Sequence, residues 1–575
     1  MEYKGIGVSN GKVLGTAVIL EEEQTPLSAT RELRKKEEVE KVSSAILTLI
    51  KEYDTIIKSG DKNSEIVSLA EAYKMMVSSS SLYEEITRLI MNENYSAVKA
   101  IEEVFTDKEN KMSLLDSDYA KERASDIRSI KKRIIRKILG INDVNISGID
   151  YDFILVSKEV TPSMLLSANP KYIKGIISEV GSKTSHVAIL SKNIGIPAIF
   201  GISKVEKILK NNEMLYADGS NGIVVNELDS NLIKNYQDEI IKYEKVNSSL
   251  NEMLDKKAKT LDGIVYEVGS NAGDVNDLER VINVKSDGVG LFRSEFLYLN
   301  RDNPPSEELQ FNAYKSFAVS LKTKPIIIRT IDIGGDKKSS FFDIPKEDNP
   351  FLGYRAIRYC LDHKDIFKTQ LRAILRASNY GNVMIMYPMI SSLEEVRTAN
   401  AILRETMAEL DEEEILYNED IKVGIMVEVP SVAIMADMFI DEVDFFSIGT
   451  NDLVQYTMAV DRTNSLVTKL YDAYNPGVIR LVKKTIDSKK DGKFIGMCGE
   501  MAADPLYIII LVGLGLDEFS VNVNSVLRVK KYISLLNYEE CKKIAEHILT
   551  LKTGTKIRSY LEIYAKEVFG IYLDL

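Results

Sequence analysis

Short apolar runs in the second half of the chain are followed by side chains that could do chemistry. They are three arginines, two carboxylates, an amide and a thiol: Arg293, Arg329, Arg462, Glu428, Asp452, Asn451 and Cys498. Arginine binds phosphate or carboxylate oxygens through two parallel hydrogen bonds. Two carboxylates with few other protein ligands suit Mg²⁺, and a cysteine can exchange a proton with a bound carbon acid. The set predicts a site for a small phosphorylated carboxylate.

This prediction rests on the number of apolar runs that end in such residues. Any one of the charged residues could instead be a solvated loop residue. Five runs end in chemically informative residues, however, and solvated loops alone would rarely produce that coincidence.

Histidine is scarce, with three in the chain, so each can be considered separately. His186 lies in GSKTSHVAIL (181–190), where a glycine and small polar residues open an apolar helix. The N–H groups at a helix N-terminus stabilise negative charge. His186 could therefore carry a phosphoryl group, although a structural role stays open. His363 and His547 lie in ordinary helical stretches and are predicted to be structural.

Eight apolar runs at helix-sized intervals would position the strand-end residues. They are 264–268, 288–292, 325–328, 383–387, 423–427, 445–448, 494–497 and 518–523. Eight strands that alternate with helices over about 310 residues predict a (β/α)8 TIM barrel. In such a barrel the active site lies at the carboxyl ends of the strands.

The first half of the chain predicts an α/β domain with a helical insertion. Glycines and alternating apolar residues in the first twenty positions indicate strands, and strand character returns after Gly148. Between about residues 27 and 140, apolar residues recur at helical spacing, which predicts about four helices. Insertions of this kind succeed at exposed turns. A polar stretch without glycine at 230–258 predicts a connecting helix.

Length and composition exclude several classes of protein. The 575 residues predict several domains. The 74 basic and 86 acidic residues give a net charge of −12, which argues against nucleic-acid binding. The longest apolar stretch, 506–516, falls short of the ~20 residues of a membrane span, and the first residues lack the form of a secretory signal. The three cysteines are too far apart for a disulfide framework or a Cys-x-x-Cys metal site. We therefore expect a cytoplasmic protein without membrane insertion.

Long motifs in a fixed order resemble one enzyme family. GSKTSHVAILSKNIGIPAIFG (181–201) resembles the phosphohistidine segment of the phosphoenolpyruvate (PEP)-utilising enzymes. Six later segments resemble the barrel motifs of that family: GVGLFRSEFLY (288–298), IIIRTIDIGGDK (326–337), NPFLGYRAIR (349–358), VGIMVEVPS (423–431), FFSIGTNDLVQYTMAVDR (445–462) and GMCGE (496–500). With a helical insertion before the histidine and no ATP-grasp region, the chain is similar to Enzyme I. Enzyme I is the PEP–protein phosphotransferase of the bacterial sugar phosphotransferase system.

The resemblance implies a role for each residue of the predicted site. His186 would accept the phosphoryl group of PEP, and Cys498 would protonate the enolate carbon to release pyruvate. Glu428 and Asp452 would ligate Mg²⁺. The residues that bind the substrate would be Arg293, Arg329, Asn451, Asp452 and Arg462.

The resemblance also implies domains and partners. A phosphohistidine domain would comprise 1–21 and 146–229, a helical subdomain 22–145, a linker helix 230–260 and a barrel 261–575. The helical subdomain would dock the histidine-containing phosphocarrier protein HPr, which receives the phosphoryl group in the first step of sugar uptake. Two barrels would pair in a homodimer.

The carrier-docking surface would lie on a predicted helix at 64–78. Tyr73 and Met75 are expected to reach the surface, because Ser78 to Ser81 would end the helix and open that edge. Leu69 is expected to pack in the core. With serines where the family often has acidic residues, attraction to a basic carrier face should depend little on salt.

Three positions near the predicted phosphohistidine depart from the family pattern. Lys183 and Lys192 stand where arginine is frequent, and Leu165 stands where threonine is usual. Lysine keeps the charge but loses the two-pronged geometry of arginine. These departures concern secondary contacts of the phosphohistidine and leave His186 as the predicted nucleophile.

Two other functions compete with this one. A PEP synthase or pyruvate phosphate dikinase-like enzyme needs a nucleotide-binding domain, and the sequence has no glycine-rich phosphate loop. A non-catalytic sensor of phosphorylation state would be expected to lose the arginine, glutamate and cysteine set, whose members are all present.

Overall fold

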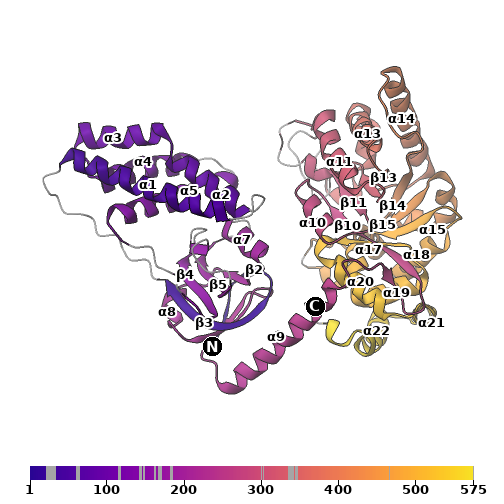
Figure 1. Cartoon of the computed structure of the whole chain (residues 1–575). Coiled ribbons are helices and arrows are strands. Elements are labelled where there is room, and N and C mark those ends of the chain that lie inside the picture. The colour runs from indigo at the N-terminus through magenta and orange to yellow at the C-terminus, as the bar shows by residue number, and fades with distance from the viewer. Residues whose placement is uncertain are drawn as a thin grey trace. The chain divides into compact units, whose positions relative to one another are not determined.

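The fold was determined as a computed structural model. It describes residues 1–20, 34–59, 65–113, 118–141, 146, 149–160, 164–165, 171–181, 186–298, 301, 303–334, 342, 347–464 and 466–573. Contacts divide the chain into two compact units, Met1–Glu244 and Lys245–Leu575. Figure 1 draws the first unit in indigo to purple and the second in magenta to yellow.

An eight-stranded sheet forms the base of the first unit, counted over the described residues. Its strands are β1 (Glu2–Lys4), β2 (Ile6–Ser9), β3 (Lys12–Leu20), β4 (Phe153–Glu159), β5 (Ile173–Val180), β6 (Ala198–Phe200), β7 (Met214–Asp218) and β8 (Ile223–Val225). The order across the sheet is β1-β8-β7-β3-β4-β5-β6-β2. The central strands β3 to β6 run parallel, and their continuous apolar sequence matches strands that are covered on both faces. The short helices α7 (His186–Ile194) and α8 (Val205–Ile208) connect the later strands.

A helical bundle lies between β3 and β4 in the chain. Its helices are α1 (Lys35–Ser59), α2 (Glu65–Val77), α3 (Ser80–Glu93), α4 (Ala97–Ser113) and α5 (Asp118–Ile138). The described ranges thus hold five helices where about four were predicted, because α3 starts almost directly after α2. Ser79 caps α3, because its side chain accepts a hydrogen bond from the backbone N–H of Leu82. Serine is one of the preferred residues at this position. Apolar side chains of the bundle and of the sheet share one core.

Helix α9 (Ser230–Asn251) contributes to both units. Near its start, Tyr236 stacks on Tyr216 of the first sheet with ring centroids 3.9 Å apart. Near its end, Val246 and Leu250 are buried, and Ser249 receives a hydrogen bond from the Tyr572 hydroxyl at 3.0 Å.

The second unit is the predicted TIM barrel. Its strands are β10 (Val265–Ala272), β11 (Val289–Arg293), β12 (Ile326–Arg329), β13 (Val383–Tyr387), β14 (Val423–Val427), β15 (Phe445–Ile448), β16 (Phe494–Met497) and β17 (Glu518–Asn522). Neighbouring strands are parallel, and β10 pairs with both β11 and β17, which closes the barrel. A short strand, β9 (Ala258–Lys259), adds to β10 in the antiparallel sense. Each apolar run predicted as a barrel strand overlaps one of these eight strands, so the predicted barrel is confirmed.

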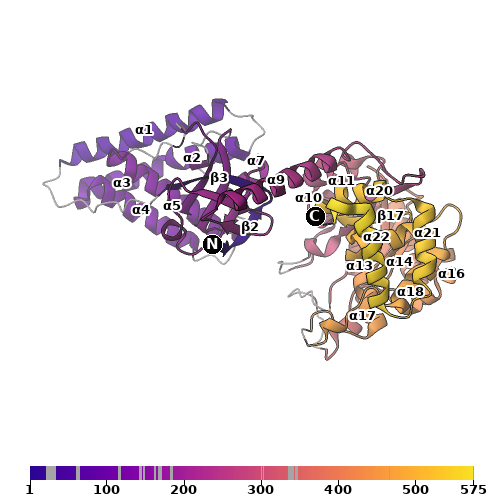
Figure 2. The same ribbon diagram turned by 90° about the horizontal axis from the view of Figure 1, so that it is seen from below.

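Helices cover the outside of the barrel (Figures 1 and 2). They are α10 (Asp277–Asn283), α11 (Glu307–Leu321), α12 (Ile357–Asp362), α13 (Lys364–Ser378), α14 (Leu393–Glu412), α15 (Pro430–Ile434), α16 (Ala436–Phe439), α17 (Thr450–Met458), α18 (Pro476–Asp487), α19 (Pro505–Leu514), α20 (Val526–Leu535), α21 (Tyr538–Ile548) and α22 (Gly554–Phe569). The apolar stretch 506–516 forms most of α19, which α21 and α22 cover. Across the described residues, no helix combines the length and the apolar character needed to span a membrane.

Candidate active site

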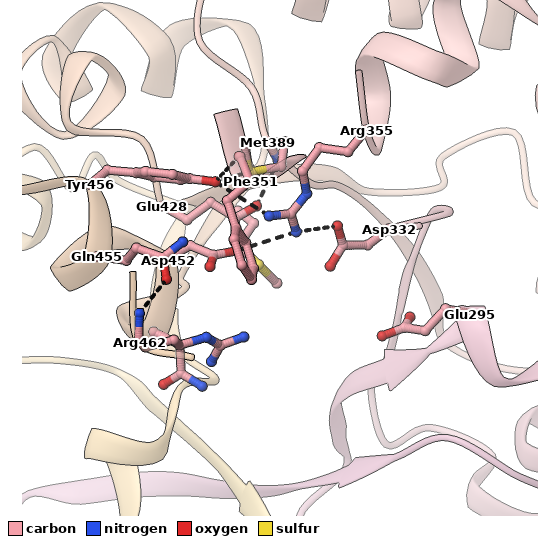
Figure 3. Close-up of polar contacts among 12 residues, drawn as sticks. Glu295, Asp332, Phe351, Arg355, Met389, Glu428, Asp452, Gln455, Tyr456 and Arg462 are labelled. Atoms are coloured by element: carbon pink, nitrogen blue, oxygen red, sulfur yellow. Dashed lines mark hydrogen bonds and ion pairs between the residues drawn. The ribbon is translucent and has the colours of Figure 1, made fainter. Parts of the chain in front are cut away.

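A buried network of ion pairs lies where strand β12 ends. Arg329, the last residue of β12, pairs with Glu295 at 2.6 Å and with Asp332 at 2.9 Å. Asp332 pairs with Arg355 at 2.8 Å, and Arg355 reaches Asp452 at 3.4 Å. Figure 3 shows the Arg355 guanidinium between Asp332 and Asp452. Because all five side chains are buried, the network fixes both arginines at the mouth of the barrel.

Glu428 and Asp452 form an acidic pair in this network. Glu428 follows β14, and Asp452 lies in the first turn of α17, just after β15. Burial and the negative charges of Asp452 and Asp332 raise the pKa of Glu428 well above its usual range, although two neighbouring arginines oppose the shift. Glu428 Oε1 accepts the backbone N–H of Met389 at 2.6 Å.

The donor set of this pair fits a divalent cation. The Asp452 Oδ1 atom is buried and has no hydrogen-bond partner in the part of the chain that the structure describes. Two adjacent carboxylates that repel each other, one of them with an unpartnered buried oxygen, suit a hard cation such as Mg²⁺, which takes one or two protein carboxylates.

A cavity of about 460 Å³ opens at the carboxyl ends of β10, β11, β16 and β17. Arg293, Cys498 and Glu500 line it. Burial raises the pKa of Cys498 to about 11, so this side chain is a neutral thiol at pH 7. A positively charged side chain and a thiol that can give a proton therefore face the same space.

Asn451 and Arg462 flank the same end of the barrel. The Asn451 amide donates to Glu500 Oε1 and accepts the Glu500 N–H, both at 3.4 Å. The backbone N–H of Arg462 donates to Gln455 Oε1 at 3.1 Å (Figure 3), which ties the segment after α17 back to that helix. The seven residues predicted from the apolar runs thus lie in one unit, at or after the carboxyl ends of β11, β12, β14, β15 and β16.

His186 belongs to the other unit, where it is the first residue of α7. Val187, Ala188 and Leu190 of this helix are buried against the sheet and bundle core. The side chain of His186 and residues 182–185 lie outside the described residues.

Comparison with known proteins assigns the family. A model of the PEP-binding domain of PEP-utilising enzymes matches residues 247–538, a model of their mobile domain matches 149–222, and a model of their N-terminal domain matches 4–123. A phosphoenolpyruvate-protein phosphotransferase of Staphylococcus aureus (strain MSSA476) is 41% identical to this chain, and the match covers 98% of this chain and 99% of that relative. One from Priestia megaterium is 39% identical, over 98% of each chain. The chain belongs to the phosphoenolpyruvate-protein phosphotransferase family.

This membership confirms the resemblance and the enzyme class predicted from the motifs. Among solved structures, the chain resembles an NMR structure described as Enzyme I (nEIt), with 28% identity and a TM-score of 0.38. That match covers 42% of this chain and 99% of the other.

Arg355 is a member of the buried ion-pair network that the sequence analysis did not single out. It lies between β12 and α12, and not at the end of a strand. The arginine is 2% exposed, and its guanidinium also donates to the Tyr456 hydroxyl at 3.3 Å. Its segment, 349–358, resembles a family motif, so the arginine two residues after the glycine of that motif was the available signal.

Replacing Arg355 by methionine should damage both stability and substrate binding. Asp332 and Asp452 would lose a buried partner, and breaking a buried pair in this way costs about 3–5 kcal/mol. We expect a lower melting temperature in thermal unfolding and a higher KM for PEP. The matched control is Arg358→Met, because Arg358 donates to the backbone carbonyls of Leu352 and Gly353. Equal losses in both variants would contradict a specific role for Arg355.

The expectation that Tyr73 reaches the surface is wrong. Tyr73 is 1% exposed, and its hydroxyl donates to Asp126 at 2.6 Å. Ala70, Tyr73 and Val77 are all buried, so the helical stripe that contains Tyr73 faces the bundle core. Met75 is 74% exposed, which confirms its predicted place on the surface. The side chain of Leu69 lies outside the described residues.

The departures near His186 have different structural settings. Leu165 is buried and packs in the core that the helices share with the sheet. Lys192 lies in the last turn of α7 and is exposed. Lys183 lies outside the described residues.

Proposed function

We propose that this enzyme transfers the phosphoryl group of PEP to its own His186 and then to a histidine of the phosphocarrier protein HPr, releasing pyruvate. The observation that carries the proposal is the barrel mouth, where buried arginines, the Glu428–Asp452 pair and the neutral Cys498 thiol meet. A small anion with a phosphate, a carboxylate and a carbon that needs a proton fits this set.

The arginines and Asn451 would bind and orient PEP. Arg293, Arg329 and Arg462 supply the planar donors that phosphate oxygens prefer. Arg329 is held in place before substrate arrives, since its guanidinium forms ion pairs with Glu295 and Asp332. Such preorganisation lowers the cost of placing charge in the transition state.

Proton transfer would fall to Cys498. As the phosphorus–oxygen bond of PEP breaks and a phosphorus–nitrogen bond to His186 forms, the leaving group is an enolate. The Cys498 Sγ–H bond then breaks and its proton goes to the methylene carbon, which yields pyruvate and a thiolate. The raised pKa of Cys498 keeps this proton on sulfur until the enolate appears.

Mg²⁺ would be held by Glu428 and Asp452. When bound, the ion neutralises negative charge on the phosphate and on the developing enolate. The remaining partners follow the resemblance to Enzyme I: HPr docks on the helical bundle, two chains pair through their barrels, and the enzyme works in the cytoplasm at the first step of sugar uptake.

Intact-mass measurement tests this function. The purified chain, incubated with PEP and Mg²⁺, should gain one phosphoryl group, and purified HPr added afterwards should remove it and gain it in turn. Omitting PEP is the control for earlier modification. A chain that gains no mass would instead be a sensor, and a gain that requires ATP would favour a PEP synthase or dikinase-like activity.

Carrier binding should depend on Met75. This flexible apolar side chain is 74% exposed on α2, and methionine suits adaptable contact surfaces. Met75→Ala should weaken HPr binding about fivefold, as loss of an apolar contact of about 1 kcal/mol would. The matched control is Met91→Ala, since Met91 is 40% exposed on α3.

The salt dependence of HPr binding distinguishes apolar docking from electrostatic docking. Because Ser78 to Ser81 follow α2 without a carboxylate, affinity measured at low and high salt should change little. A steep loss of affinity with salt, together with full binding by Met75→Ala, would contradict this account.

A further inference from the structure

The inside of the barrel has an apolar side and a polar side. On the apolar side Cys498 belongs to a cluster against which Phe494 packs; its other members are Leu291, Ile327, Met384, Met386, Met426 and Phe445. Bulky apolar side chains are the usual filling of a TIM barrel. On the polar side, β10 contributes Asn271 and β17 contributes Glu518 and Ser520. The polar side therefore adjoins the end of β16, where Cys498 lies.

The side-chain amide of Asn271 bridges Ser520 and Cys498. Its Nδ2 atom donates a hydrogen bond to the backbone carbonyl of Cys498 at 3.3 Å. Its Oδ1 atom accepts a hydrogen bond from the Ser520 hydroxyl at 2.6 Å. Because an amide donates only through nitrogen and accepts only through oxygen, the Ser520 hydroxyl fixes which end of the amide faces Cys498.

This bond holds a carbonyl that lies beyond the strand ladder. The pairing of β16 with β17 ends at Met497 and Phe519, one residue before Cys498. On the other side of β16, the Cys498 N–H donates to the Ile448 carbonyl of β15 at 3.2 Å. Buried backbone groups need partners, and the Asn271 amide serves the Cys498 carbonyl where the ladder has stopped.

An irregularity in the sheet lies directly beside Asn271. In the pairing of β10 with β11, Ser270 is opposite Val289 and Asn271 is opposite Leu291, so Gly290 is an extra residue on β11. A Cβ atom at Gly290 would lie 2.6 Å from the Ser520 Oγ atom. The glycine thus leaves room for the hydroxyl that orients Asn271. Such bulges often re-aim a side chain beside an active site.

The other side of Cys498 is closely packed. A Cβ atom at Gly499, the next residue, would overlap the Thr450 Oγ1 atom of α17. The Cys498 thiol lies 3.9 Å from the Ile448 carbonyl oxygen, to which it donates a weak hydrogen bond. The backbone of Cys498 is therefore confined by β15 and α17 on one side and by Asn271 on the other. Asn271, Arg293 and Cys498 line the same cavity.

We propose that Asn271 is a positioning residue that holds the Cys498 peptide so that the thiol faces the carbon it protonates. This inference rests on the proposed function, in which the Cys498 Sγ–H bond breaks and a C–H bond of pyruvate forms. Asn271 keeps its own protons throughout and acts only through the Cys498 carbonyl. A displacement of about 1 Å at a reacting group can cost about 10²-fold in rate.

Steady-state kinetics with PEP, Mg²⁺ and excess HPr test the proposal. Asn271→Leu removes both hydrogen bonds at similar side-chain volume, and kcat should fall about 10- to 100-fold. PEP affinity, measured by calorimetry with Mg²⁺, should stay within about twofold of the parent. Ser520→Ala keeps the amide but removes the group that orients it, so kcat should fall by a smaller factor. This second variant leaves Asn271 in place if Asn271→Leu fails to fold.

Ser270→Ala is the matched control for a lost hydrogen bond in β10. Ser270 precedes Asn271, is 0% exposed, and donates to the Ser286 hydroxyl at 2.9 Å. Because successive side chains of a strand point to opposite faces, Ser270 faces away from the cavity. Ser270→Ala should lower the melting temperature, as Asn271→Leu should, but kcat should stay within about twofold of the parent.

A double variant decides whether Asn271 acts through Cys498. If it does, Asn271→Leu should cause no further loss of kcat in a Cys498→Ala chain, because residues that act as one unit have non-additive effects. Losses that multiply in the double variant would overturn the proposal. A loss of PEP affinity at unchanged kcat would also overturn it, since Asn271 would then be a substrate-binding residue.

Two further results separate this inference from the proposed function. Parental kcat in both Asn271→Leu and Ser520→Ala, with Cys498→Ala slow, would overturn the positioning role and leave Cys498 as the acid. Parental turnover by Cys498→Ala itself would refute the proton transfer of the proposed function, and the positioning role would fall with it.

Discussion

Replacing His186 by alanine should abolish the gain of a phosphoryl group from PEP. Helix α7 begins at His186, and the unpaired N–H groups of a helix start stabilise the charge of a phosphorylated imidazole. Intact-mass measurement after incubation with PEP and Mg²⁺ checks this result. Pyruvate release in the presence of HPr should fall to background in the same variant.

The other two histidines provide matched controls for His186→Ala. His363 stacks on Tyr359 with ring centroids 3.9 Å apart, and His547 packs beside Tyr560 on the outer helices. His363→Ala and His547→Ala should therefore still acquire the phosphoryl group. Label that persists on the His186→Ala chain and disappears from one of these two would move the nucleophile there.

Replacing Cys498 by alanine should separate binding from turnover. PEP affinity, measured by calorimetry with Mg²⁺, should stay close to that of the parent, since the arginines provide the contacts. Turnover should fall by about 10²- to 10⁴-fold, the usual worth of a positioned general acid. The loss should appear in kcat, with little change in KM.

Two buried cysteines elsewhere in the barrel serve as controls for Cys498. Cys360 and Cys541 are both 0% exposed, so Cys360→Ala and Cys541→Ala test the general cost of a lost core thiol. They should lower the melting temperature and leave kcat within about twofold. Parental turnover by Cys498→Ala would show that this thiol only packs the barrel.

The barrel could be predicted from the sequence because its strands are buried on both faces. Such strands read as short continuous apolar runs, and residues just after them gather at one end of the barrel. That rule found Arg329, Glu428 and Cys498. It could not find Arg355, which reaches the site from the segment before α12, where no periodic pattern marks it.

The helical bundle was harder to predict from the sequence. Helix α2 carries apolar side chains at successive positions, so periodicity alone does not say which of Tyr73 and Met75 faces the core. The structure decides it through the Tyr73–Asp126 hydrogen bond, a contact between residues 53 positions apart. The boundary between α2 and α3 is short for a local reason, because Ser79 already caps α3 two residues after α2 ends.

Unpaired polar atoms inside the barrel also limit the thermal stability of the protein. Each buried donor or acceptor without a partner costs about 1–3 kcal/mol of folding free energy, and the two carboxyl oxygens of Glu518, at the start of β17, are such atoms within the described residues. An apolar replacement such as Glu518→Met should therefore raise the melting temperature. Selection for thermal stability alone would remove this acid from the barrel.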